Sequence, residues 1–194
     1  MKILVTGGSS SGKSAFAEKV ACSLSKPHIY FATMQPFGED GERRIARHRE
    51  LRRERDFLTV ECYGGYEALD LAAAAGVSVS DGTLLVECVG NIVANVQFGS
   101  GEKGETLPET VGELADAVFS GIEALSLQCA NAVVVANEIG SDGISYPCET
   151  NVYMRALGAV NCRLAACFDV VYEVVVGCPV ALKRPEGTFA WELY

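Results

Sequence analysis

The chain has 194 residues, of which 49% are hydrophobic, and its formal net charge at neutral pH is −9. This composition excludes a disordered chain, and the excess of acidic residues argues against nucleic acid as a general partner. No apolar run approaches the roughly 20 residues that span a bilayer, and no secretory signal precedes the first strand, so we expect a soluble cytoplasmic protein.

Strands and helices are predicted to alternate through a single domain over residues 1–194. The predicted strands do not alternate between apolar and polar residues, which indicates burial on both faces, and helices between strands favour parallel pairing. We therefore expect a three-layer α/β domain with a mainly parallel sheet that binds ligands at the carboxyl ends of its strands. The predicted strands are 2–6, 28–33, 57–61, 83–88, 132–136 and 170–176, with a possible edge strand at 189–193, and the predicted helices are 14–24, 42–55, 67–75, 91–97, 108–129 and 149–168.

A glycine-rich segment links the first strand to the first helix and has the spacing of a phosphate-binding P-loop. Its backbone N–H groups and the helix N-terminus behind them are suited to anionic oxygens. We expect Lys13 to reach the outer phosphates of a nucleoside triphosphate and the Ser14 hydroxyl to hold Mg²⁺. The alternative is an ordinary turn between strand and helix. The segment is Gly7, Gly8, Ser9, Ser10, Ser11, Gly12, Lys13 and Ser14.

Two acidic residues follow predicted strands and are candidates for the second Mg²⁺ ligand. Glu87 follows Leu84-Leu85-Val86, and Glu138 follows a later apolar run that ends at Asn137. Magnesium bound to a triphosphate prefers carboxylate oxygens at such positions. The alternative for either residue is a solvated carboxylate at a strand end.

Seven of the sixteen lysines and arginines lie between Arg43 and Arg55, in a predicted helix that also contains His48. Arg44, His48 and Arg52 share one face of that helix. Neighbouring guanidinium groups lower the pKa of an imidazole, which keeps it neutral and nucleophilic, and they bind phosphate oxygens. His48 is therefore a candidate to attack the α-phosphorus of a nucleotide and expel pyrophosphate. Spacing alone favours a surface histidine on a solvated helix.

The eight cysteines include no C-x-x-C pair, and the chain has only two histidines. We expect buried, reduced thiols rather than disulfides or a metal cluster.

Five segments together resemble one known family of enzymes. The P-loop is common to many families, whereas the Arg-His-Arg block combined with a late Asn-Glu-x-Gly is much more specific. In order and spacing the chain resembles the bifunctional adenosylcobinamide kinase / adenosylcobinamide-phosphate guanylyltransferase family over nearly its whole length. The segments are Val5–Ser14, Tyr30–Thr33, Arg44–Arg49, Leu84–Cys88 and Asn137–Gly140.

This resemblance implies a late step of cobalamin biosynthesis and a RecA-like P-loop fold. Adenosylcobinamide would be phosphorylated by a nucleoside triphosphate, ATP or GTP, and its phosphate would then receive GMP from GTP through a guanylylated His48. Lys13 is the second residue assigned to catalysis, Mg²⁺ the cofactor, and a homotrimer the implied assembly. Besides the P-loop, the implied nucleotide-site residues are Thr33, Met34, Gln35, Arg49, Glu50, Leu51, Arg52, Glu61 and Glu87.

Two other functions are compatible with a P-loop. A kinase of another small metabolite would need Lys13 and Ser14 but not His48. A nucleotide-switched binding protein would hydrolyse its nucleotide slowly and bind a partner in only one nucleotide state.

Overall fold

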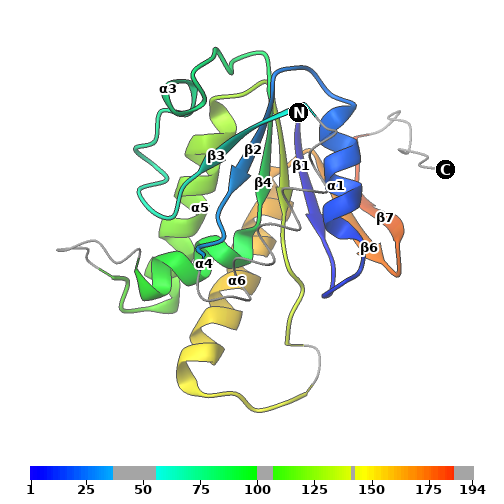
Figure 1. The fold of residues 1–194 in the computed structure, drawn as a ribbon. Helices are drawn as coiled ribbons and strands as arrows, with labels where there is room; N and C mark the ends of the chain where they lie inside the picture. Colours follow the sequence, from blue (N-terminus) through cyan, green and yellow to red (C-terminus); the bar gives the residue numbers. More distant parts are fainter. Residues whose placement is uncertain (37–55, 100–106, 141–142, 186–194) are drawn as a thin grey trace.

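The computed structural model describes residues 1–36, 56–99, 107–140 and 143–185. Within these ranges the chain forms a seven-stranded sheet in the order β3-β2-β4-β5-β1-β6-β7, with helices on both sides (Figure 1). The strands are β1 (Lys2–Thr6), β2 (His28–Ala32), β3 (Phe57–Glu61), β4 (Thr83–Glu87), β5 (Asn131–Val135), β6 (Val170–Val175) and β7 (Cys178–Lys183). The helices are α1 (Lys13–Cys22), α3 (Leu71–Ala75), α4 (Val89–Phe98), α5 (Val111–Leu127) and α6 (Cys148–Cys167).

The pairing of the strands brings the carboxyl ends of β1, β4, β5 and β6 to one edge of the sheet. β1 lies between β5 and β6 and is parallel to both, with Val5 opposite Val135 on one side and Tyr172 on the other. β4 is parallel to β5, and Glu87 is opposite Val135 in that register. Only the last pair, β6 with β7, is antiparallel among the described strands.

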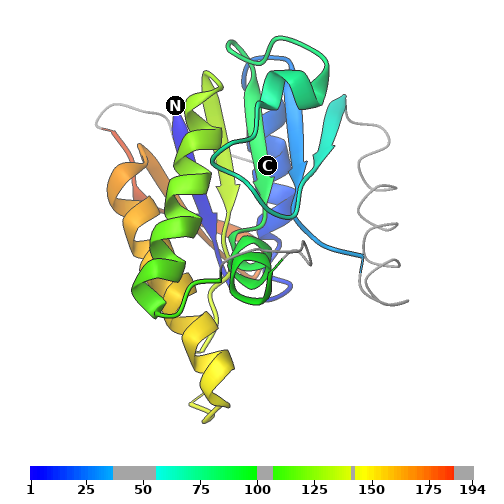
Figure 2. The same cartoon turned by 90° about the vertical axis from the view of Figure 1, so that its left-hand side faces the viewer.

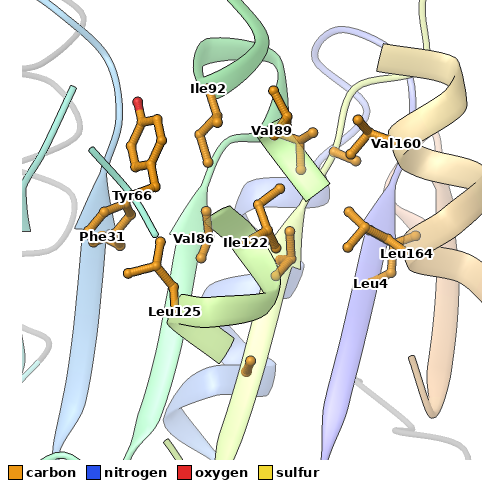
Figure 3. Packing of buried hydrophobic residues seen from close by; sticks show 14 of the residues in the cluster. Leu4, Phe31, Tyr66, Val86, Val89, Ile92, Ile122, Leu125, Val160 and Leu164 are labelled. Carbon is orange, nitrogen blue, oxygen red and sulfur yellow. The ribbon is translucent and has the colours of Figure 1, made fainter. Parts of the chain in front are cut away.

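The two faces of the sheet are covered by different helices. One face packs on α1 through Phe16, Val20 and alternate strand residues such as Val5 and Val135. The opposite face packs on α4, α5 and α6, which lie together on that side of the sheet (Figure 2). Side chains from those helices and from the sheet meet in this larger cluster, which contains Leu4, Phe31, Val86, Ile92, Ile122 and Leu164 (Figure 3).

The expected α/β architecture and the six predicted strands within the described residues are confirmed, most within one residue at each end. Two helices begin later than predicted. α5 starts at Val111 rather than Pro108, because Thr110 and Glu113 form a capping box that fixes the first turn. α3 starts at Leu71 rather than Glu67, where the Asp70 side chain accepts a hydrogen bond from the Ala73 N–H.

The antiparallel strand β7 was not predicted, because it is short and contains Pro179, a residue that argues against a strand except at the edge of a sheet. Three predicted features, the helix at 42–55, the polar loop at 99–105 and the edge strand at 189–193, lie wholly or largely outside the described residues. Among the helices that are described, none combines the length and the apolar character needed to cross a membrane.

Candidate functional site

The P-loop joins β1 to α1 and is tightly packed at its two ends. At Gly7 a side-chain carbon would lie 2.6 Å from the Val174 carbonyl oxygen, and the backbone φ of +152° is one that side chains disfavour. Gly12 has a φ of +92° and serves as the N-cap of α1. Glycine is therefore required at both positions because of the backbone conformation, and at Gly7 also because the Val174 carbonyl oxygen leaves no room for a side chain.

Lys13 opens the helix with its ammonium group turned back into the loop. Its Nζ donates to the Gly8 carbonyl oxygen at 3.1 Å, and the residue is 8% exposed. The N-terminus of α1 has no side-chain cap and no acidic residue in its first turn. The partial positive charge at the helix N-terminus and the full positive charge of Lys13 therefore both lie at this loop. No carboxylate in the first turn of α1 neutralises them. Such an arrangement favours an anion with several oxygens, as phosphates have.

Ser14 and Glu87 are brought together at the mouth of the P-loop. The Ser14 hydroxyl donates to Glu87 Oε1 at 2.5 Å, although the residues come from α1 and from the end of β4. A hydroxyl and a carboxylate are hard oxygen donors, which is the ligand set that Mg²⁺ prefers beside a bound phosphate. The donor set of this pair therefore fits a magnesium ion.

A buried hydrogen-bond network holds the backbone next to Glu87. Thr33, at the end of β2, is fully buried, and its hydroxyl donates to the Glu87 carbonyl oxygen at 2.7 Å and lies 3.2 Å from the Cys88 carbonyl oxygen. The Asn95 amide of α4 donates to the Thr33 carbonyl oxygen at 2.8 Å and to the Tyr66 hydroxyl at 2.9 Å. The Thr33 hydroxyl thus fixes the backbone at Glu87, whose carboxylate contacts Ser14.

Sequence reasoning missed Asn95 and Tyr66. Both are buried, at 8% and 4% exposure. The sequence does contain a signal for Asn95, because its amide side chain lies within a helical segment where the neighbouring residues Ile92, Val93 and Val96 are apolar. An amide there needs buried partners, which indicates a network rather than a solvent-facing position.

The other predicted residues that the structure describes lie at different strand ends. Met34 and Gln35 are half-buried and follow Thr33. Glu138 is exposed but adjoins the P-loop, since its N–H donates to the Gly7 carbonyl oxygen at 3.0 Å. Glu61 ends the edge strand β3, and β2, β4 and β5 lie between that strand and β1. His48, Arg49, Glu50, Leu51 and Arg52 lie outside the described residues.

The expectation that the cysteines are buried was wrong. All eight are free thiols; five are exposed and three are half-buried. Three of the exposed ones, Cys148, Cys162 and Cys167, belong to α6, whose buried residues are Ala156, Leu157, Val160 and Leu164. No group of three or more His, Cys, Asp and Glu side chains suited to a metal ion occurs among the described residues.

One thiol adjoins the site. Burial of the Cys88 sulfur, and next the negative charge of Glu87, raise the pKa of Cys88 to about 11. The Cys88 thiol is therefore protonated at neutral pH and is a poor nucleophile.

Comparison with known proteins identifies a family and relatives over almost the whole chain. The family described as "Cobinamide kinase / cobinamide phosphate guanyltransferase" matches residues 3–182. The bifunctional adenosylcobalamin biosynthesis protein CobU of Salmonella typhimurium is 33% identical over 189 residues, covering 94% of this chain and 100% of that protein. The CobU protein of Escherichia coli is 32% identical over 187 residues, with 94% and 100% covered.

Among solved structures, an ATPase from the type III secretion system of pathogenic bacteria aligns with a TM-score of 0.54 at 15% identity, over 93% of this chain and 56% of that one. This likeness concerns the fold alone. It confirms the expected class, a RecA-like P-loop α/β fold with a mainly parallel sheet.

Proposed function

The chain belongs to the cobinamide kinase / cobinamide phosphate guanyltransferase family, and from that premise we propose how its described site serves the two reactions. It is an enzyme of adenosylcobalamin biosynthesis that acts on cobinamide substrates with nucleoside triphosphates. The observation that carries the assignment of residues is the meeting of Lys13, Ser14 and Glu87 at one P-loop.

Each residue of the P-loop site has a separate role in the proposal. The Gly7–Ser14 segment surrounds the phosphates, and the Lys13 ammonium neutralises charge on the outer ones. Ser14 and Glu87 would hold Mg²⁺, and the ion would supply neutralising positive charge to the bound phosphates. Thr33 fixes the Glu87 backbone, so that the carboxylate stays beside Ser14. In the kinase reaction this site orients the γ-phosphate towards the hydroxyl of adenosylcobinamide.

In the second reaction we assign the covalent carrier to His48, on the basis of the resemblance. The imidazole nitrogen attacks the α-phosphorus of GTP, an N–P bond forms, and the bond to the pyrophosphate oxygen breaks. A phosphate oxygen of adenosylcobinamide phosphate then attacks the same phosphorus, which gives adenosylcobinamide-GDP and frees the imidazole. Arg49, Glu50, Leu51, Arg52 and Glu61 belong to the nucleotide site in this proposal, as do Met34 and Gln35.

Three further points belong to the same proposal and are supported by the family resemblance. Residues 1–194 act as one nucleotide-binding domain, the enzyme assembles as a homotrimer, and it is cytoplasmic. ATP and GTP are both proposed as phosphoryl donors, and GTP as the guanylyl donor.

The experiment that tests the carrier is labelling with GTP radiolabelled at the α-phosphate. We expect the wild-type protein to retain label in an acid-labile, base-stable bond, and the His48→Ala and Lys13→Ala variants to retain none. A His48→Ala variant that is labelled like wild type would reject the assignment. Wild-type protein that phosphorylates adenosylcobinamide but never retains label would show a kinase without guanylyl transfer through the protein.

A further inference from the structure

Asn137 follows β5 and lies directly beside the P-loop. The N–H of the preceding residue donates to the Val5 carbonyl oxygen at 2.9 Å, and the N–H of the following residue donates to the Gly7 carbonyl oxygen at 3.0 Å. In the sheet, β5 lies between β1, which leads into the P-loop, and β4, which ends at Glu87. Asn137 is therefore placed between the start of the phosphate loop and the end of the strand that carries Glu87.

The two ends of the Asn137 amide have different surroundings. Its Oδ1 is buried and accepts no hydrogen bond from the described residues. A side-chain carbon added at Gly90, in the first turn of α4, would lie 2.8 Å from this Oδ1 and 2.8 Å from the Tyr153 hydroxyl oxygen of α6. Figure 1 shows α4 and α6 together at the end of β4. The Nδ2 of Asn137 also has no partner among the described residues, but it is not one of the buried atoms, so it is the end that a ligand can reach.

Two residues of α6 direct the rest of Asn137 away from the ligand side. The Asn161 amide donates to the Asn137 backbone carbonyl oxygen at 3.1 Å. Burial, and next the charge of Cys88, raise the pKa of Tyr153 to about 12, so its hydroxyl keeps its proton at neutral pH and is a donor that suits the nearby Oδ1. The carbonyl end of the amide therefore belongs on the α6 side, which leaves the N–H groups for the other side.

The asparagine at the opposite end of β5 shows how a structural amide is used in this fold. The Asn131 Nδ2 donates to Ser25 Oγ at 2.9 Å, and its Oδ1 accepts from the N-terminal ammonium group of Met1 at 3.2 Å. Both ends of that amide have partners within the protein. Asn137 has neither kind of bond with the described residues, and buried amide atoms without partners are uncommon in proteins. Its amide is therefore better explained by a ligand than by the stability of the fold.

We propose that Asn137 is a phosphate-binding residue whose Nδ2 donates to an oxygen of the outer phosphates beside Lys13, and that Tyr153 positions its amide. This inference rests on the proposed function, because it needs a triphosphate in the P-loop. Lys13 supplies charge, whereas an amide N–H supplies a directed hydrogen bond without adding charge. The outer phosphates are transferred in the kinase reaction and leave as pyrophosphate in the guanylyl reaction, so one contact serves both.

The test measures the binding of GTP and of inorganic tripolyphosphate, each with Mg²⁺, by calorimetry. For Asn137→Ala we expect both Kd values to rise about tenfold, because a hydrogen bond to a charged group is lost. Asn137→Asp keeps the shape and the oxygen that faces Tyr153, so it is expected to fold, and its negative charge should weaken both ligands further. Asn131→Ala is the matched control on the same strand, and it should lower the melting temperature but leave both Kd values unchanged.

A double-mutant cycle tests the positioning role of Tyr153. Tyr153→Phe removes only the hydroxyl, and we expect it to raise the Kd of tripolyphosphate about 2- to 5-fold. In the Asn137→Ala background the same change should have no further effect, because the hydroxyl acts through the amide. A merely structural tyrosine would lower the melting temperature without changing the Kd.

The proposal is overturned if Asn137→Ala and Asn137→Asp bind tripolyphosphate as wild type does. Its second part is overturned if Tyr153→Phe leaves the Kd unchanged, or if it raises the Kd equally with and without the Asn137 amide. Failure of the proposed function looks different, because Lys13→Ala would then bind tripolyphosphate and GTP as tightly as wild type.

Discussion

The Ser14 hydroxyl donates to Glu87 Oε1 across a separation of 73 positions in the sequence. This contact links the first turn of the P-loop helix to the end of the strand two places away in the sheet. Two side-chain oxygens from different elements, the Ser14 hydroxyl of α1 and the Glu87 carboxylate of β4, are thus in direct contact. The fold itself therefore brings together the two residues that we propose as Mg²⁺ ligands, and packing of α1 against the sheet fixes their relative position.

Glu87→Gln should raise the Mg²⁺ concentration needed for half-maximal activity by about tenfold or more, because a neutral amide replaces a charged ligand. Titration of GTP-dependent phosphorylation with Mg²⁺ at saturating nucleotide measures this. Glu138→Gln tests the other acid at the same edge and should change the requirement less. If Glu138→Gln raised the Mg²⁺ requirement more than Glu87→Gln does, the assignment of Glu87 as the metal ligand would be contradicted.

Thr33→Val keeps the shape of the side chain but removes the hydroxyl that donates to the Glu87 carbonyl oxygen. We expect a loss of about 1–2 kcal/mol in the free energy of unfolding. The Mg²⁺ requirement should also rise, because the carboxylate is less well positioned, and Thr33→Ser should restore it. Urea unfolding and the same Mg²⁺ titration provide the two measurements. A Thr33→Val enzyme that is destabilised but has a wild-type Mg²⁺ requirement would show that Thr33 acts on stability alone.

Asn95→Ala removes two buried hydrogen bonds, to the Thr33 carbonyl oxygen and to the Tyr66 hydroxyl. The expected cost is about 2–3 kcal/mol in the free energy of unfolding, and Tyr66→Phe should cost about 1 kcal/mol. Because the two residues share one bond, the double variant should lose less than the sum of the single losses. Additive losses in urea unfolding would show that the Asn95–Tyr66 bond contributes little.

Stability should fall in alkaline solution. Burial raises the pKa of the Cys129 thiol to about 11 and of the Tyr153 hydroxyl to about 12, and the Cys88 thiol is raised to about 11 by burial and by Glu87. A folded-state pKa above the unfolded value gives stability that is complete below the unfolded pKa and lost as the pH rises through the folded one. The free energy of unfolding should therefore decline from about pH 9 upwards.

Alkylation tests at the level of single residues whether the pKa of Cys88 is raised. At pH 8, iodoacetamide should modify the exposed Cys22 and Cys178 well before Cys88, since only a thiolate reacts. Peptide mass spectrometry of the native protein measures each site, and urea-unfolded protein should show similar rates at all three. Rapid modification of Cys88 in the native protein would contradict its raised pKa.

The sequence predicted the elements that carry strong local signals and missed those that depend on distant partners. The P-loop was found because its glycines and Lys13 are adjacent, and Glu87 because it follows a continuous apolar run. Thr33 is predicted as a nucleotide-site residue, and what the sequence did not indicate is that its hydroxyl donates to the carbonyl oxygen of Glu87 at the end of β4, a partner 54 positions away. The pairing of Asn95 with Tyr66 and the approach of Asn137 and Tyr153 to Gly90 arise from packing between distant elements, which no local pattern encodes.

Two helical glycines, one in α5 and one in α6, allow a paired test of helix packing on the sheet face that α4, α5 and α6 cover. A methyl group added at Gly121 of α5 would lie 2.8 Å from Tyr66 Cβ, whereas one added at Gly158 of α6 would meet no neighbour within 4 Å. Gly121→Ala should therefore destabilise the protein by about 1–3 kcal/mol through overpacking, and it should disturb the Tyr66–Asn95 bond. Gly158→Ala should stabilise it by about 0.5–1 kcal/mol, because alanine loses less backbone entropy in a helix. Urea unfolding of the two variants checks both signs at once. Equal stabilisation by both would mean that α5 moves away from Tyr66 at little cost, and that the buried network tolerates the shift.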